Sequence, residues 1–254
     1  MDISEFSRLD NKSNYNRHPW ETSRKNVLHT FLKKSGIKFP IDRVVDIGSG
    51  DSYVIHTLLE KDYAKEYFAI DTAYTSEVVS QLKINNNNSR VIYLQSLKEY
   101  EENYPTDKTT LFLCMDVLEH VEDEKIILDF LKPSSPNKNY YFFAVPAFQS
   151  VFSSHDVLLG HYRRYTLPQL NSLLEKNQFE IVDKGYYFTI LLLFRKLDKF
   201  LKKDKEASID NWKAGKFKTT LINTMLKVDF KIGLFFNKLG ITIPGLSCYC
   251  LCKK

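Results

Sequence analysis

VVDIGSGDS, residues 44–52, places a β-branched run before a glycine turn, and residues 52–64 follow with helical character. This order of strand, tight turn and helix is typical of the opening unit of an α/β domain. Gly48 and Gly50 let the backbone approach a ligand closely, and the amides at the start of the next helix favour an anionic group such as a carboxylate. A glycine turn alone fits several kinds of ligand.

Strands and helices alternate along the chain around this turn. Helices are predicted at residues 18–36 and at residues 166–176, where Thr166 and Gln169 form a capping box. The alternation predicts a doubly wound sheet with helices on both faces. Further strands are predicted at residues 67–71, 91–94, 110–115, 139–148, 179–188 and 245–254.

The chain of 254 residues is long enough for one large α/β domain, which we divide into four predicted parts. Residues 1–40 are expected to form an N-terminal helical lid, and residues 41–188 the ligand-binding core. Residues 189–243 are predicted to be a helical insertion, and residues 244–254 supply the final strand of the core.

The net charge of +5 is distributed unevenly, with 15 Lys and Arg against 5 Asp and Glu from Lys184 onward. A basic segment indicates contact with a phosphate-bearing partner or a membrane surface, and a solvated helix face is the simpler interpretation. The N-terminus lacks the pattern of a secretory signal, and the strongest apolar run is about half of a membrane span. These features predict a cytoplasmic protein.

Three of the four cysteines, Cys248, Cys250 and Cys252, alternate along the last predicted strand. Their side chains should therefore point to one face of the sheet. Cysteines on a buried strand usually act as small hydrophobic residues, whereas a metal site normally needs a fourth ligand and turn geometry. We expect them to pack in the core.

Two residues narrow the choice of ligand for the glycine turn. The dinucleotide fingerprint GxGxxG requires a third glycine, and Tyr53 stands in its place, which argues against NAD or FAD. Asp71 ends the second predicted strand, where a carboxylate can accept hydrogen bonds from both hydroxyls of a ribose. A helix cap is the alternative role for Asp71.

VVDIGSGDS, FAID and MDVLEHVED, in this order and spacing, resemble the successive motifs of class I S-adenosylmethionine-dependent methyltransferases. The resemblance covers residues 41–185. It extends to RHPWETSR before the core and SSHDVLLGHYRRYT after the fifth strand, which look like a bacterial subgroup often found among sugar, lipid and secondary-metabolite genes. It implies a Rossmann-like, seven-stranded, mostly parallel sheet whose last strand is antiparallel.

The resemblance also implies a set of residues that bind S-adenosylmethionine. In many relatives an aspartate after the third strand binds the adenine amino group, and this chain has Gln95, Ser96 and Leu97 there. The contact is then expected from a backbone amide or from Ser96. The remaining cofactor contacts implied are Asp46, Gly48, Ser49 and Gly50 for the methionine part, Asp71 and Thr72 for the ribose, and Asp116 and Val117 for the methionine or adenosine side.

Methyl transfer is an in-line displacement from a sulfonium, so the protein has to align the nucleophile and exclude water, and a hydroxyl nucleophile also needs a base. His155 and His161 follow the fifth strand and are candidate bases, with Asp156 to orient the imidazole. Anchoring of the loop is their alternative role. His120 is either a second base or a residue that positions its helix. The spacing of Asp116, Glu119 and His120 fits no tight metal motif, so no metal is expected.

Arg163 and Arg164, followed by Tyr165, suit an anionic acceptor, because guanidinium groups match carboxylates and phosphates. Salt bridges to the acidic part of the chain are the alternative. Trp20 is expected to begin a lid helix over the acceptor, with core packing as its alternative role.

The predicted insertion, residues 189–243, combines apolar spacing with lysines. This pattern fits an amphipathic helix at the inner face of a membrane, a homodimer contact or a substrate lid. The favoured function is O-methylation of a small molecule, a glycan or a lipid-linked glycan, with N- or C-methylation open. An RNA methyltransferase is the alternative that the basic C-terminal part suggests, but DVLEH lacks the motif of amino-directed nucleic-acid enzymes, so nucleic acid is disfavoured. A catalytically silent cofactor-binding subunit is the third hypothesis.

Overall fold

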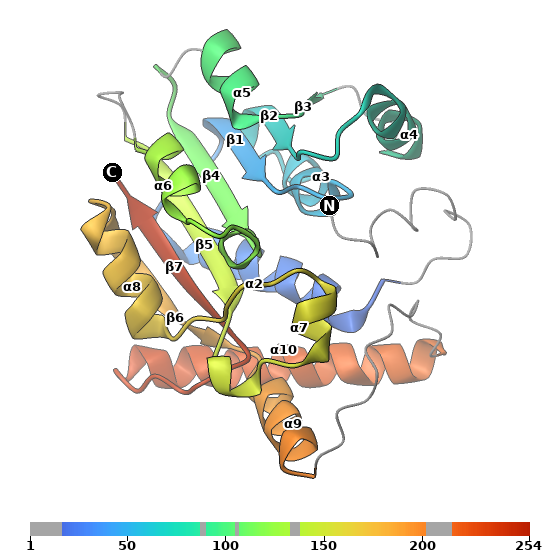
Figure 1. Cartoon of the computed structure of the whole chain (residues 1–254), viewed down its shortest axis with the longest axis vertical. Coiled ribbons are helices and arrows are strands. Elements are labelled where there is room, and N and C mark those ends of the chain that lie inside the picture. The colour runs from blue at the N-terminus through green and yellow to red at the C-terminus, as the bar shows by residue number, and fades with distance from the viewer. Residues whose placement is uncertain (1–16, 87–89, 105–106, 133–137, 202–214) are drawn as a thin grey trace.

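A computed structural model describes residues 17–86, 90–104, 107–132, 138–201 and 215–254. Its centre is a seven-stranded sheet in the order β3-β2-β1-β4-β5-β7-β6 (Figure 1). Only β7 pairs antiparallel to its neighbours, so the prediction of a doubly wound, mostly parallel sheet is confirmed. The strands are β1 (Ile41–Ile47), β2 (Ala64–Ile70), β3 (Val91–Leu94), β4 (Thr110–Met115), β5 (Tyr140–Pro146), β6 (Glu180–Tyr187) and β7 (Ser247–Lys253).

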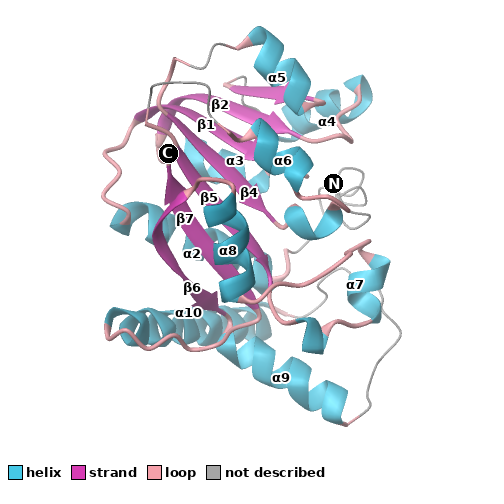
Figure 2. Ribbon diagram, turned by 60° about the vertical axis from the view of Figure 1, so that its left-hand side comes forward, coloured by secondary structure: helices cyan, strands magenta, loops and turns pink. Residues whose placement is uncertain are grey.

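Helices cover both faces of this sheet (Figure 2). The side chains of α2 (Pro19–Lys34), α3 (Tyr53–Leu59) and α10 (Lys216–Lys238) pack with one face. Those of α6 (Lys125–Phe130) and α8 (Leu167–Lys176) pack with the other. The remaining helical segments are α4 (Ser76–Asn86), α5 (Leu97–Asn103), η1 (Leu118–His120), η2 (Gln149–Val151), α7 (Ser154–Leu158) and α9 (Thr189–Phe200).

The cysteines of β7 lie on one face of the sheet, as their spacing predicts. Cys248, Cys250 and Cys252 are buried in the hydrophobic cluster that also holds residues of α6 and α8. All three are free thiols. They therefore act as small apolar residues of the core, which confirms the prediction.

The N-terminal helix and the predicted insertion share the core of the sheet. Phe31 of α2 stacks on Tyr249 of β7 at 3.8 Å between ring centroids and meets Phe230 of α10 edge-on at 5.3 Å. In Figure 1, α10 runs along one end of the molecule beside α2. The buried side of the N-terminal helix therefore stabilises the sheet, and its role as a lid stays a prediction. Residues 1–16 and 202–214 of these two predicted parts lie outside the described residues.

The described helices include none with the length and apolar character that crossing a bilayer requires.

Candidate active site

The candidate site lies where the strand order of the sheet reverses. On one side of β1 the sheet continues with β2 and β3, and on the other side with β4 and β5. In open α/β sheets, ligands bind outside the carboxyl ends of the strands at such a switch point. The glycine turn follows β1, and Asp116 follows β4.

Gly48 brings the loop after β1 against the loop after β4. Its φ of +67° lies in the left-handed region, and its N–H donates to Ile70 O at 2.8 Å. A Cβ built at this position would lie 2.6 Å from Cγ2 of Val117, which follows β4. A side chain at position 48 would therefore require the backbone or Val117 to move.

Asp71 connects the end of β2 to the same turn. One carboxylate oxygen accepts the Gly50 N–H at 3.0 Å, and the other accepts the Ala73 N–H at 3.0 Å. The hydroxyl of Tyr74 donates to Gly50 O at 2.8 Å. The glycine turn and the predicted ribose carboxylate are thus held together, with Asp71 almost completely buried.

Asp46 lies near the end of β1, just before the glycine turn. Its carboxylate accepts a hydrogen bond from the Ser49 hydroxyl at 2.8 Å. Burial raises the pKa of Asp46 to about 7, although the bond from Ser49 opposes the shift. A cationic group beside this carboxyl would favour its charged form, as the ammonium of an amino acid would.

Ser96 and Thr72 lie in the loops after β3 and β2. The Ser96 hydroxyl caps α5 by accepting the Glu99 N–H at 3.1 Å. The side-chain amide of Gln95 donates to Thr72 O at 3.4 Å. These contacts order the loops beside Asp71, where the resemblance places the ribose and the adenine.

Two arginines tie the start of α2 to the candidate site. Arg24 forms an ion pair with Asp116, and its guanidinium lies 4.8 Å from the centre of the Trp20 ring. Arg17 pairs with Asp51 of the glycine turn at 2.6 Å. Trp20 is 36% exposed, so it belongs to the surface at this end of the helix.

Asp156 organises the loop after β5. Its carboxylate is completely buried and accepts hydrogen bonds from Nδ1 of His161 at 2.9 Å and from Nε of Arg164 at 2.7 Å. The second oxygen accepts from Nη2 of Arg164 at 3.1 Å and from the N–H of Ser153 at 2.9 Å. These donors hold the pKa of Asp156 well below its usual range. His155, whose pKa burial lowers, lies on the adjoining α7.

The segment that follows is bound to the loop after β4. Arg163 pairs with Glu124 at 2.5 Å and donates to Glu122 O at 2.6 Å. The hydroxyl of Tyr165 contacts Leu118 O at 3.1 Å and Glu124 Oε1 at 2.9 Å. Arg163 therefore forms an ion pair with the acidic part of the chain, as Arg164 does with Asp156.

Glu119 and His120 belong to η1, next to this segment. Glu119 is completely buried, and burial raises the pKa of its carboxyl to about 8. Its backbone carbonyl accepts the Tyr162 N–H at 2.8 Å. The ring of His120 meets that of His161 edge-on, with 4.6 Å between centroids. The structure thus brings His120 next to His161, which lies 41 residues further along the chain and is bonded to Asp156.

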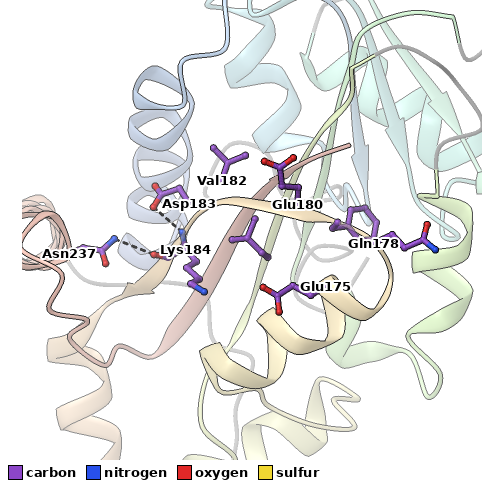
Figure 3. Close-up of a pocket in the computed structure, with 9 residues that line it drawn as sticks. Glu175, Gln178, Glu180, Val182, Asp183, Lys184 and Asn237 are labelled. Carbon is purple, nitrogen blue, oxygen red and sulfur yellow. Dashed lines mark hydrogen bonds between the residues drawn. The ribbon is translucent and has the colours of Figure 1, made fainter.

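A separate surface depression lies along the edge strand β6 (Figure 3). Glu175, Glu180, Asp183 and Lys184 are among its lining residues, and Asn237 donates a hydrogen bond to Lys184 O at 3.2 Å. None of the residues that line it belongs to the loops after β1, β2, β4 or β5. We therefore assign it no part in the candidate site.

Sequence reasoning missed two residues of the site. Arg24 lies one helical turn after Trp20, and this spacing is the only signal that it shares a face with the predicted lid residue. Tyr74 lies three residues after Asp71, but its contact with Gly50 depends on how the two loops fold.

No family model and no curated protein matches the sequence. Solved structures match over the whole chain. A chain described as a sarcosine dimethylglycine methyltransferase from Galdieria sulphuraria superposes with a TM-score of 0.59 and 11% identity, covering 100% of this chain and 98% of that one. A complex of the Haloferax volcanii Trm112 methyltransferase activator with a methyltransferase gives a TM-score of 0.54 and 11% identity, covering 99% and 97%.

Phosphoethanolamine N-methyltransferase 2 of Haemonchus contortus, in complex with S-adenosyl-L-methionine, gives a TM-score of 0.56 at 16% identity. All of this chain aligns, and it spans 57% of the length of that protein. The chain therefore has the class I methyltransferase fold, as the motifs predicted.

Proposed function

We propose that the protein is an S-adenosylmethionine-dependent methyltransferase. The observation that carries the proposal is the contact between Gly50 and Asp71, because it joins a glycine-rich turn to a buried carboxylate at the switch point of the sheet. The fold supports the same function. The position of Gly48 against Val117 supports it further, since the turn is built for close backbone approach.

The pocket residues fit the cofactor by charge and hydrogen bonding. Asp46 would face the ammonium, and the backbone of residues 48–50, with Ser49, the rest of the methionine part. Asp71 and Thr72 would hold the ribose, Ser96 the adenine, and Asp116 and Val117 the side nearest β4. When bound, the cofactor supplies an electrophilic methyl group on a sulfonium. The protein has to bind it, orient the acceptor and exclude water.

On the acceptor side, we assign His161 as the residue that activates the oxygen to be methylated. Asp156 fixes the ring of His161 through Nδ1, which leaves Nε2 for the acceptor. His120 and His155 lie beside it as supporting groups. Arg164 and Tyr165 line the same loop, and we assign Trp20, at the start of α2, to the acceptor as well. Arg163, which is partly exposed, is the residue that we assign to an anionic group of the acceptor.

The acceptor that we propose is a hydroxyl of a small molecule or glycan, including one carried on a lipid. An apolar stripe on α9 supports the lipid-linked form. Its exposed members share one helix face and are accompanied by basic residues. Lys199 on the same helix contacts Ser150 O of η2 at 2.8 Å, which places α9 beside the loop after β5. The exposed apolar residues are Leu193, Phe194, Leu197, Phe200 and Leu201.

The test is transfer of a labelled methyl group from S-adenosylmethionine to an extract of the source cells, with aqueous and lipid phases counted separately. With the wild type we expect the labelled methyl group in one of the two phases. With His161→Gln the rate of transfer should fall at least ~100-fold, in line with the usual contribution of general base catalysis. Tyr162→Phe, a neighbouring exposed position, is the matched control and should retain activity. Cofactor binding without any transfer would support a silent subunit and contradict the enzyme.

A further inference from the structure

Three side chains with metal-binding atoms meet beside the acceptor region. Glu119 and His120 come from η1, and His161 comes from the loop after α7. One ligand atom from each lies within 4.8 Å of the other two. The Tyr162 N–H to Glu119 O hydrogen bond, at 2.8 Å, holds the two segments in this arrangement.

Glu119 is the unusual member of this group. Its side chain is completely buried, and neither carboxylate oxygen has a hydrogen-bond partner among the described residues. The guanidinium groups nearby are already engaged, Arg24 by Asp116 and Arg164 by Asp156. A buried carboxyl without partners is costly, so this position favours either a proton or a cation.

His161 is oriented as histidine ligands of metals usually are. Its Nδ1 is bonded to the buried carboxylate of Asp156, at 2.9 Å. Metal-bound histidines commonly donate their second ring N–H to a carboxylate, which fixes the tautomer and the direction of the ligand nitrogen. Asp156 is held in turn by both donor groups of Arg164, so the orientation of the ring is rigid.

We infer that Glu119, His120 and His161 bind a divalent transition-metal ion. Two imidazoles and one carboxylate form one of the ligand sets of catalytic zinc sites, and three protein ligands leave an open position. Ligands of a tetrahedral zinc ion lie roughly 3.4 Å apart, so the ligand atoms, now within 4.8 Å of one another, would have to move closer when the ion binds. The spacing in sequence predicted no metal, because Asp116 was the expected third ligand. The structure pairs Asp116 with Arg24 and supplies His161 from 41 residues further along the chain.

The role of the ion rests on the proposed function. The open position would take the acceptor oxygen, which would release its proton to solvent water at a lower pH than without the ion. With the ion bound, Nε2 of His161 would be a metal ligand and could not also take the proton of the acceptor, so activation through the ion would replace the direct base role proposed above for His161.

The experiment is a titration of untagged, chelator-treated full-length protein with Co²⁺, followed by visible absorption and by competition with Zn²⁺. We expect one ion per chain and affinity at least ~10-fold weaker in Glu119→Gln and in His161→Gln. His155→Gln is the matched control, because it changes a neighbouring imidazole outside the cluster, and it should bind as the wild type does. Circular dichroism establishes that each variant is folded.

Wild-type protein that binds no Co²⁺ at millimolar concentration would overturn the inference. Equal affinity in the wild type, Glu119→Gln and His161→Gln would overturn it as well. The same samples are titrated with S-adenosylhomocysteine. Protein that binds S-adenosylhomocysteine but not Co²⁺ would contradict the metal site alone. Protein that binds Co²⁺ but not S-adenosylhomocysteine would contradict the proposed function alone.

Discussion

A Cβ on Gly48 would lie 2.6 Å from Cγ2 of Val117, so the loops after β1 and β4 touch at a point where only glycine fits. The φ of Gly48, +67°, imposes a second demand for glycine at the same place. This contact closes the base of the proposed cofactor pocket. The steric contact with Val117 and the positive φ of Gly48 can be tested by separate substitutions.

Gly48→Ala should destabilise the protein by about 2–5 kcal/mol, because it adds steric overlap to a backbone strain of roughly 1–2 kcal/mol. Gly36→Ala is the matched control: its φ is +74°, but its Cβ would meet no atom within 4 Å. Gly36→Ala should therefore lose only the stability that corresponds to the backbone strain. Chemical denaturation of both variants measures the free energy of unfolding. Adding Val117→Ala to Gly48→Ala should recover the steric part, and equal losses in Gly48→Ala and Gly36→Ala would contradict the contact.

Asp71→Asn should weaken binding of S-adenosylhomocysteine by about 10–100-fold, because a charged acceptor for the ribose hydroxyls is worth about 1.5–3 kcal/mol. The amide oxygen can still accept one of the two backbone N–H groups that Asp71 holds, that of Gly50 or that of Ala73, and circular dichroism checks that the variant is folded. Calorimetric titration measures the affinity.

Tyr74→Phe is the structural comparison for Asp71→Asn. It removes the hydrogen bond to Gly50 O without removing a group assigned to the ribose. Tyr74→Phe should lower the free energy of unfolding and should weaken binding of S-adenosylhomocysteine only slightly. If Asp71→Asn binds as tightly as the wild type, Asp71 is not the ribose ligand.

Glu119 should make the metal-free protein less stable as the pH rises. In the unfolded chain its carboxyl titrates near ~4.3, whereas in the folded protein burial raises the pKa to about 8. Between these values the folded state holds a proton that the unfolded state has lost, so the free energy of unfolding falls as pH increases. Glu119→Gln should flatten this decline, as measured by denaturation with chelator from pH 5 to pH 8.

The pKa of Asp46, raised to about 7, also makes stability fall as the pH rises, and it does so equally in the wild type and in Glu119→Gln. The difference between their two pH profiles therefore reports the contribution of Glu119. Parallel pH profiles for the two proteins would show that Glu119 is not held protonated by burial.

The apolar stripe of α9 should mediate binding to vesicles that contain anionic lipid. Phe194→Ser combined with Phe200→Ser removes two large exposed side chains, which are 53% and 83% exposed, and should abolish flotation with the vesicles at low salt. Ile84→Ser on α4 removes an apolar residue that is 76% exposed elsewhere on the surface and should leave flotation unchanged. Absence of wild-type flotation at low salt would remove the lipid-linked form of the proposal.

Local sequence predicted the sheet well, because each strand carries its own pattern. The β-branched run before Gly48 and the alternating cysteines of β7 identify strands without any knowledge of tertiary contacts. The packing of α10 against α2 was not predictable, since the contact of Phe31 with Phe230 joins residues about 200 positions apart. Amphipathic spacing shows that a helix has an apolar face but not which partner covers it.

The same distinction applies to the site. Asp71 and Gly50 were predictable neighbours, because adjacent parallel strands end at the same edge of the sheet. The burial of Glu119 was not, because it arises from the hydrogen-bonded contact between η1 and the segment around Tyr162. The local sequence of neither segment indicates that the two are in contact.

Calorimetric titration of the purified protein with S-adenosylhomocysteine tests the central claim most directly. We predict one site per chain, with a dissociation constant in the range of roughly 1 µM to 1 mM that is usual for enzyme ligands. Absence of heat from folded protein at millimolar ligand, at more than one temperature, would contradict the account.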